Sequence, residues 1–423
     1  MGAGVETTAP PLTAPRLPIW VMGLAMAPFG LLGGVWAVTT PQLLASQHVP
    51  EPMIATVTAL SGLPTSVGFL ASPVLDVWIS RRAWTLGLAV LTGLLLFAAL
   101  LCHQSVLAIG AFLFLAWFSA ILFAGVAGAW LSSLLPQEKR ASLAAWSTVG
   151  NTGAGGLAVF IAMPLLRDLP FLAGAAVLGL AVMAPVLPLL LLEAPPPDAR
   201  LSNEGLTAFL RDLRTLATRP HIVRLLILFL APAAAFSLTN LLGGLGDQFR
   251  ASERFVSTVG GAGVTVAGII GSLLVPRLLK LTTPVRLYLL IGSVGALFTA
   301  GLLLAPHGPA TFAVAMIGEN AFQAAAFTAS FAITFRSVGT DNPLAATQVS
   351  LLTGAGNGPI TYMQILDGRA YGAAGIAGAF AFDSAVSLVA CAIMALWLWR
   401  RQEPDLPDGS GDAGAVVADP AGG

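Results

Sequence analysis

Hydrophobic residues run through this chain in long blocks, and short polar segments separate them. Each block is about 20 residues long or longer, the length that an α-helix needs to cross a bilayer. The pattern therefore predicts an all-α polytopic membrane protein with twelve transmembrane helices. Their expected ranges are 19–44, 52–75, 84–102, 105–135, 141–165, 170–192, 221–246, 255–279, 285–305, 309–335, 343–365 and 371–399.

The ends and the middle of the chain interrupt this pattern. Residues 1–18 are small and Pro-rich, and residues 401–423 are acidic and Gly/Pro-rich, so we expect a disordered leader and a disordered tail. Residues 194–220 alternate apolar and charged positions at helical spacing, which predicts a linker with an amphipathic helix on the inner leaflet; a solvated linker is the alternative. Two six-helix bundles remain, residues 19–193 and 221–400.

The positive charges orient the predicted helices. With the N-terminus inside, all 20 lysines and arginines except Arg167, Arg250, Arg254 and Arg369 fall in inner segments. Inner loops of membrane proteins carry this excess of positive charge. The pattern predicts an even number of helices, two cytoplasmic termini, and a place in the cytoplasmic (inner) membrane of the cell.

Composition agrees with a lipid environment. The chain is 56% hydrophobic, only 9% charged and without net charge, with a mean hydropathy of +0.85. Soluble domains carry roughly a quarter charged residues. Because there is no basic domain to collect phosphates, nucleic acid is excluded as a partner. The sequence also shows no cluster of metal ligands, and Cys102 and Cys391 read as buried free thiols. We therefore expect the bilayer and a small solute as partners, no cofactor, and a monomer.

The two predicted halves echo each other weakly. Corresponding helices repeat short pairs at offsets of about 205 residues, and two glycine-rich segments, 147–156 and 353–364, occupy equivalent positions. Such paired segments point to the central path of a transporter; tight helix packing is the alternative. The repeated pairs are Ala27-Pro28 with Ala231-Pro232, Ala45-Ser46 with Ala251-Ser252, and Gly150-Asn151 with Gly356-Asn357.

Two carboxylates lie inside predicted spans. Glu319 is near the middle of its helix and Asp383 is in the last helix, and no lysine or arginine lies at similar depth. Intramembrane ionisable groups are costly and are functional candidates by default. A carboxylate in low dielectric favours its protonated form, so both residues are candidates for proton coupling. A protonated structural acid is the alternative for each.

Uncharged side chains are candidates for the substrate path. The absence of a lysine or arginine away from the helix ends disfavours a multiply anionic substrate and favours neutral, zwitterionic or cationic solutes. The candidate residues are Trp36, Thr39, Gln42, Asn151, Asn240, Gln323, Asn357 and Gln364.

The segment between the second and third predicted helices resembles a family motif. Asp76 and Arg81 fit part of the Gly-x-x-x-Asp-Arg-x-Gly-Arg-Arg turn of the major facilitator superfamily. Gly62-Leu63-Pro64, the Ser-Pro-x-x-Asp of residues 72–76 and Ala346-Thr347-Gln348 resemble the peptide/acetyl-coenzyme A/drug transporter family, which includes AmpG-like muropeptide permeases. The resemblance covers residues 19–400. It departs from those permeases at residues 123–133, where their helix carries acids.

Charges at this turn suggest a latch on the cytoplasmic face. An aspartate at a helix end pairs with basic groups or caps a neighbouring helix. The resemblance is the main support for this latch. It would consist of contacts that form in one conformation and break in another, made by Asp76, Arg81 and Arg82. A solvated loop is the alternative.

A secondary active transporter of the major facilitator type fits these features best. We expect a proton-coupled symporter that moves a muropeptide or peptide-like solute by alternating access, with a proton gradient as energy source. A proton-driven exporter of drugs or metabolites, a siderophore importer, and a non-transporting sensor or assembly subunit are the alternatives. The chain has neither a phosphate-binding Gly-x-x-x-x-Gly-Lys-Ser/Thr loop nor a nucleophile–base constellation, so an enzyme is not expected.

Overall fold

The computed structural model describes residues 17–76, 79–192, 211, 214–216, 218–338, 342 and 344–400. Within these residues every regular element is a helix, as the hydrophobic blocks predicted. The predicted tail lies outside the described residues, as does nearly all of the predicted leader and most of the linker, including most of its amphipathic helix.

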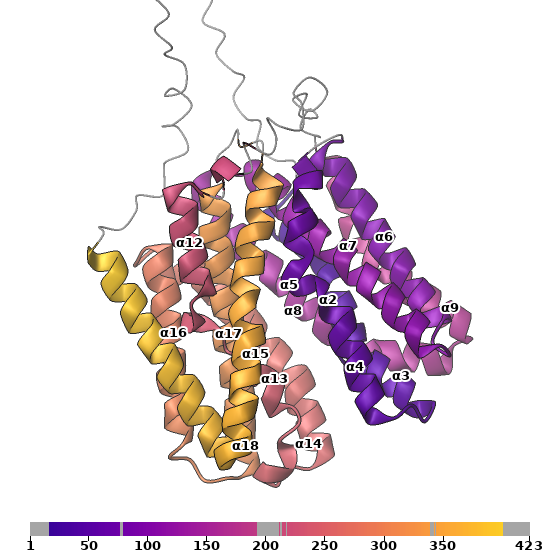
Figure 1. Ribbon diagram of the computed structural model, residues 1–423. Coiled ribbons are helices and arrows are strands. Elements are labelled where there is room, and N and C mark those ends of the chain that lie inside the picture. Colours follow the sequence, from indigo (N-terminus) through magenta and orange to yellow (C-terminus); the bar gives the residue numbers. More distant parts are fainter. Residues whose placement is uncertain are drawn as a thin grey trace, which may run out of the picture.

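The N-terminal half is a bundle of long helices, some of them built from shorter segments (Figure 1). Its first helical stretch joins α1, α2, η1 and α3, and its second joins α4, α5 and η2. The elements are α1 (Ile19–Leu24), α2 (Ala27–Gly34), η1 (Val35–Thr39), α3 (Thr40–Ser46), α4 (Glu51–Gly62), α5 (Pro64–Val67), η2 (Gly68–Asp76), α6 (Arg81–Leu101), α7 (Val106–Ser133), α8 (Gln137–Asp168), α9 (Phe171–Met183) and η3 (Ala184–Leu191).

The C-terminal half repeats this plan. Its last element, α18, is two helices joined at Ala374 and Gly375, where the backbone leaves helical geometry and Gly375 adopts φ 64°. Glycine takes this left-handed conformation without steric cost. The elements are α12 (Pro220–Leu230), η4 (Pro232–Ala234), α13 (Leu238–Leu242), η5 (Gly246–Phe249), α14 (Glu253–Thr258), η6 (Val259–Gly263), α15 (Val264–Leu278), α16 (Pro284–Leu302), α17 (Pro309–Ser337) and α18 (Ala345–Arg400).

Fewer helices are long and apolar enough to cross a membrane than the sequence predicts. Eight helical stretches of the described residues are long and apolar enough to cross a bilayer. One of them, α18, consists of two helices joined at a kink. The expected spans 52–75 and 221–246 are broken into short pieces, because Pro64 and Pro232 interrupt regular helix there. The expected span 309–335 is one helix, α17, but is not among the eight. The count of twelve stays a prediction.

The two halves meet at one end of the molecule and diverge toward the other (Figure 1). One hydrophobic cluster crosses between them, with Phe123 and Trp130 of α7 packed beside Phe335 of α17 and Val349 of α18. The other large clusters stay inside one half each. We call the joined end the closed end and the other the open end.

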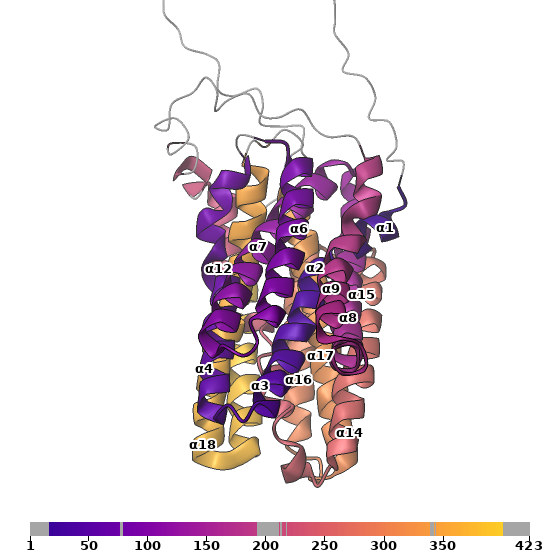
Figure 2. The ribbon, with the colours of Figure 1, turned by 90° about the vertical axis from the view of Figure 1, so that its right-hand side faces the viewer.

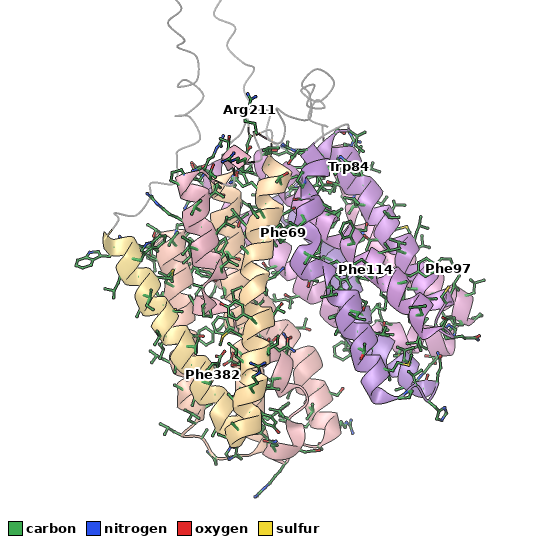
Figure 3. All side chains as sticks on the ribbon, viewed as in Figure 1. Phe69, Trp84, Phe97, Phe114, Arg211 and Phe382 are labelled. Atoms are coloured by element: carbon green, nitrogen blue, oxygen red, sulfur yellow. The ribbon has the colours of Figure 1, made fainter. Side chains whose placement is uncertain are left out.

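The described ends of the chain point the same way. The start of α1 and the end of α18 both lie toward the closed end (Figures 1 and 2). Apolar side chains cover the outer faces of both halves (Figure 3), and Leu107 and Leu304 are 83% and 91% exposed. Exposed apolar surface of this extent is typical of contact with lipid. Which side of a membrane the closed end faces stays a prediction.

Candidate functional site

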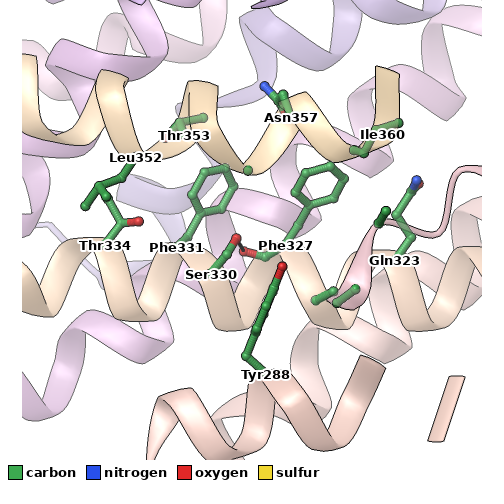
Figure 4. A pocket seen from close by; sticks show the side chains of 14 residues that line it. Tyr288, Gln323, Phe327, Ser330, Phe331, Thr334, Leu352, Thr353, Asn357 and Ile360 are labelled. Carbon is green, nitrogen blue, oxygen red and sulfur yellow. Dashed lines mark hydrogen bonds between the residues drawn. The ribbon is translucent and has the colours of Figure 1, made fainter. Parts of the chain in front are cut away.

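A cavity of about 460 Å³ lies between the halves. Its volume is within the range of roughly 300–1,000 Å³ that is typical of small-molecule sites. Aromatic rings form much of its wall, and amides and hydroxyls interrupt them; none of its lining side chains is charged. Figure 4 shows a smaller neighbouring pocket that shares wall residues with this cavity; there, Phe327 and Phe331 of α17 lie between that helix and Thr353 and Asn357 of α18.

Three of the predicted path residues line this cavity. Asn151 comes from α8, Gln323 from α17 and Asn357 from α18. Asn151 and Asn357 belong to the repeated Gly-Asn pairs, so corresponding positions of the two halves face one cavity. Two polar atoms of the wall, Asn151 Oδ1 and Ser350 Oγ, are buried and lack a hydrogen-bond partner in the described residues. Buried polar atoms are rarely left unsatisfied, so both atoms keep an unused capacity for a hydrogen bond.

The other predicted path residues lie away from the cavity wall. The Trp36 indole donates to Ser61 Oγ at 2.9 Å and packs edge-on against Trp117, 5.4 Å between ring centroids, inside the N-terminal half. Thr39 is fully buried. Gln42 is exposed at the open end, and Asn240 donates to Gln364 Oε1 at 3.4 Å. The part of these five residues in a substrate path stays a prediction.

The two glycine-rich segments, 147–156 and 353–364, have different surroundings, and glycines of α2 pack against the first of them. Gly30 of α2 packs so closely on α8 that a Cβ there would lie 1.9 Å from the Asn151 carbonyl oxygen, and one at Gly34 would lie 2.3 Å from that of Gly155. Gly356 of α18 has no atom within 4 Å of its Cβ position. Close packing therefore explains the glycines of α2 and α8, while Gly356 faces open space.

Asp76 joins the halves at the closed end. Its carboxylate accepts the backbone N–H groups of Ala346 and Thr347 at 3.0 and 2.8 Å and the Thr347 hydroxyl at 2.7 Å. These groups belong to the first turn of α18, where unsatisfied N–H groups and the helix dipole favour an anion. Asp76 and the Ala346-Thr347-Gln348 motif, which carried the family resemblance separately, are therefore in direct contact.

Arginines add further contacts at the closed end. Arg81 pairs with Asp76 at 3.3 Å and donates to the Asn342 carbonyl at 2.9 Å. Arg140, which is 5% exposed at the start of α8, donates to the Phe335 and Val338 carbonyls at 2.8 and 2.7 Å. Both arginines therefore bond to backbone of the other half.

Arg82 differs from its neighbour. It donates to the Leu190 carbonyl at 2.8 Å, inside the N-terminal half. Asp76 and Arg81 thus cross between the halves and Arg82 does not, although the sequence grouped all three. Whether they act as a latch stays a prediction.

Burial has the largest influence on the pKa of Asp76, which is raised from its usual value. Burial raises the pKa of this carboxyl, which follows the predicted span 52–75, while the Arg81 guanidinium and hydrogen bonds from Thr347 and Ala346 lower it. The ionised form of Asp76 therefore depends on contacts with the other half.

The predicted proton-coupling residues are both buried in the C-terminal half. Glu319 is 0% and Asp383 is 3% exposed. Glu319 lies against the Thr299 hydroxyl, and the Ser237 hydroxyl is 3.3 Å from Asp383 Oδ1. A third acid, Asp367, is also fully buried and bonds to the same Ser237. Asp367 lies beyond the predicted end of its helix at residue 365, whereas α18 continues past it, so the sequence did not indicate this acid.

The chain resembles known proteins in sequence and in fold. The sequence model described as Major Facilitator Superfamily matches residues 33–361. No curated relative matches the chain in sequence.

Solved structures share the fold at low sequence identity. The chain superposes on the proton:xylose symporter XylE with a TM-score of 0.71 at 12% identity, covering 91% of this chain and 96% of that one. A bacterial homologue of the iron transporter ferroportin in an outward-facing state gives 0.65 at 17% identity, covering 91% and 100%. FucP in an outward conformation gives 0.62 at 14% identity, covering 89% and 99%.

Proposed function

Because the chain belongs to the Major Facilitator Superfamily, we propose that it is a secondary active transporter that moves a small organic solute by alternating access. The family and the similar solved structures are transporters and not enzymes. The observation that carries the proposal is a solute-sized cavity between two halves that are hydrogen-bonded to each other at one end.

The transport cycle follows from the position of these bonds. Asp76 and Arg140 hold the closed end, and their partners are backbone groups at the termini of α18 and α17. Rocking one half against the other breaks these bonds and exposes the cavity at the closed end. We place that end at the cytoplasm, in an inner membrane, as the distribution of positive charges predicts.

The cavity wall favours a particular solute class. Rings such as Phe69 and Phe331 offer stacking surfaces, and Asn151 and Asn357 offer amide hydrogen bonds. The lack of charged lining residues disfavours solutes with several net charges. We propose an uncharged or zwitterionic solute with amide groups, and a peptide-like compound or muropeptide, as the AmpG-like resemblance implies, is the first class to test.

We further propose that a proton gradient drives uptake through Glu319 and Asp383. Both acids are buried in the half that forms one wall of the cavity, and Asn320, next to Glu319, lines it. Protonation of an acid beside the substrate path links solute movement to proton movement.

Export of amphipathic drugs is the second candidate function. The same uncharged aromatic wall would bind apolar ring systems without a specific polar partner. The direction of transport distinguishes it from the first candidate.

Uptake into proteoliposomes tests the proposal. We expect a labelled anhydromuropeptide to accumulate under an inward proton gradient with the wild-type protein, and Glu319→Gln to abolish the dependence on the gradient. Uptake that survives in Glu319→Gln would remove this residue from coupling and keep the substrate class. Failure of both proteins to take up the label, together with gradient-driven movement of an amphipathic dye in the opposite direction, would favour export.

A further inference from the structure

A small recess, the pocket shown in Figure 4, adjoins the large cavity inside the C-terminal half. Its volume is about 20 Å³, and a space of more than roughly 10–15 Å³ can hold one water-sized group. Among the described residues, none of its lining side chains is charged. The recess is placed to receive a small part of a larger solute, because five residues line both spaces: Gln323, Phe327, Phe331, Thr353 and Asn357.

Tyr288 of α16 gives the recess a polar group of its own. None of the described residues that line the large cavity belongs to α16. The Tyr288 ring packs edge-on against Phe229, 5.6 Å between ring centroids, and only 5% of Tyr288 is exposed. Figure 4 shows its side chain reaching from α16 toward the part of α17 that carries Phe327 and Ser330. Packing on α12 therefore holds the ring while its hydroxyl is directed into the recess.

The Tyr288 hydroxyl is buried without a partner. It makes no hydrogen bond within the described part of the chain. The same holds for the hydroxyl of Thr334, a residue of the same recess that is only 1% exposed. Buried polar groups nearly always have a hydrogen-bond partner. Two unpartnered hydroxyl groups at one recess therefore point to an occupant that bonds to them.

The hydroxyl of Ser330, also at the recess, has a fixed direction. Ser330 Oγ donates to the Phe327 carbonyl oxygen at 2.9 Å, and a carbonyl oxygen can only accept. The single hydrogen of Ser330 is therefore committed, and its oxygen can only accept from an occupant. The hydrogen of the Tyr288 hydroxyl is uncommitted and can be donated to one.

The count of donors and acceptors selects the occupant. A group that matches Tyr288 and Ser330 accepts one hydrogen and donates another. A hydroxyl does both, whereas a carbonyl oxygen only accepts and a methyl group does neither. A charged group is disfavoured, because the described lining offers no opposite charge to balance it. The small volume agrees with a hydroxyl, since a ring or a carboxylate is larger than one water molecule.

We propose that the recess is a subsite for one hydroxyl group of the transported solute, with Tyr288 as a specificity-determining residue. Tyr288 donates to the solute oxygen and Ser330 accepts the solute hydrogen, while the rest of the solute stays in the large cavity. The inference rests on the proposed function, and it narrows the solute class to compounds that carry a hydroxyl group beside their amides. A water molecule that stays in the recess is the competing occupant.

Binding of matched uncharged peptides to the purified full-length protein tests the subsite without transport. The probes are N-acetyl-trialanine amide and its three single-serine variants, so each variant differs from the parent by one oxygen atom. We expect at least one serine peptide to bind about fivefold more tightly than the parent, the effect of one hydrogen bond. Tyr288→Phe should remove this preference and leave the affinity for the parent unchanged. Titration calorimetry measures the dissociation constants.

Tyr362→Phe is the matched control. The Tyr362 hydroxyl donates to the Leu230 carbonyl at 2.8 Å, and Tyr362 lines neither the large cavity nor the recess. This variant should therefore keep the serine preference. Because the Tyr288 hydroxyl has no partner in the described residues, Tyr288→Phe should not lower the thermal unfolding midpoint. A lower midpoint would show that the hydroxyl supports the fold, through a resident water, and would count against the subsite.

The scarcity of tyrosine permits a local readout. The chain has three tyrosines, so protein labelled with 3-fluorotyrosine gives three fluorine NMR signals, which single Tyr→Phe variants assign. The preferred serine peptide should shift the signal of Tyr288, whereas the parent peptide should not. A shift caused equally by both peptides would mean that the solute passes near Tyr288 without a hydrogen bond to it, contrary to the proposal.

The opposing outcomes separate the subsite from the proposed function. Equal affinity for all four peptides, or a serine preference that survives Tyr288→Phe, would overturn the subsite and leave water as the occupant. Failure of all four peptides to bind would overturn the solute class and the subsite together. A preference that behaves as expected without gradient-driven uptake would keep the subsite and overturn the transport proposal. Uptake of labelled anhydromuropeptide with the same KM in wild type and Tyr288→Phe would do the reverse.

Discussion

The two halves of the molecule bury different charges. In the N-terminal half, Asp76 and Arg140 are buried at the closed end, and both bond to backbone groups of the other half. In the C-terminal half, Glu319, Asp367 and Asp383 are buried and contact hydroxyl groups of their own half. The two halves thus use buried charges differently: charges of one half bond to the other half, whereas the acids of the C-terminal half contact groups of their own half.

Physical chemistry explains why these charges are not interchangeable. Asp76 faces a helix N-terminus and an arginine, which stabilise its ionised form. Among the described residues, the hydrogen-bond partners of the three acids of the C-terminal half are the Ser237 and Thr299 hydroxyls, which carry no charge. The contrast predicts that changes at the closed end alter the shape of the molecule, whereas changes in the acid cluster alter its proton content.

The largest expected effect comes from Asp76→Ala. It removes hydrogen bonds to a charged group, each worth roughly 1.5–3 kcal/mol, and about 3 kcal/mol shifts a two-state equilibrium roughly 150-fold. We expect the closed end to open and the open end to narrow. Spin labels at Gln42→Cys and Asn240→Cys, with both native cysteines replaced, should report a shorter distance by double electron–electron resonance.

Arg82→Ala is the control for this change. It removes a hydrogen bond from the same turn, but that bond to Leu190 stays inside one half. The distance distribution should therefore match that of the unsubstituted labelled protein. An identical shift in both variants would mean that the turn acts through local folding and not through contact between the halves.

The next largest effect concerns stability. Gly30→Ala places a Cβ 1.9 Å from the Asn151 carbonyl oxygen, so α2 and α8 must separate. Overpacking of this kind costs about 1–3 kcal/mol. We expect a lower thermal unfolding midpoint in detergent, measured by intrinsic fluorescence. Gly87→Ala, a helical position in the same half with no neighbouring atom within 4 Å, is the control and should not lower the midpoint.

The sequence was informative wherever a residue type is rare in its context. Asp76 and Glu319 stand out because charges are scarce in this chain, and the structure places both in buried contacts. The repeated Gly-Asn pairs led to Asn151 and Asn357 at the cavity. An all-helical fold of the major facilitator type is likewise confirmed.

The sequence did not predict which face of each helix is buried, nor where each helix begins and ends. A membrane helix is apolar on all sides, so the periodicity that identifies a buried face is weak. The sequence therefore did not show that Trp36 and Thr39 pack inside the N-terminal half instead of lining the cavity. Asp367 was missed because the predicted helix ended at residue 365, whereas this limb of α18 continues to the break at Ala374. The sequence placed Arg140 in a polar loop and did not show its contact with α17, because its partner there is almost 200 residues away along the chain.

A smaller effect is expected at the cavity. Asn151→Ala and Asn357→Ala each remove an amide from equivalent positions of the wall, and a hydrogen bond of this kind contributes about 1 kcal/mol. We expect each variant to raise the KM of uptake about fivefold with little change in maximal rate. Gln364→Ala, outside the wall, should leave KM unchanged. A KM effect of Gln364→Ala without one at either asparagine would move the solute path toward the open end.

The smallest effect is expected from Gly356→Ala. Nothing lies within 4 Å of the new Cβ, and alanine is more favourable than glycine inside a helix by about 0.5–1 kcal/mol. The unfolding midpoint should therefore rise slightly, opposite in sign to Gly30→Ala. Uptake adds the decisive comparison: an unchanged rate means that Gly356 faces open space throughout the cycle. A slower rate in this more stable protein would show that another backbone approaches Gly356 once the closed end opens, as α8 already approaches Gly30.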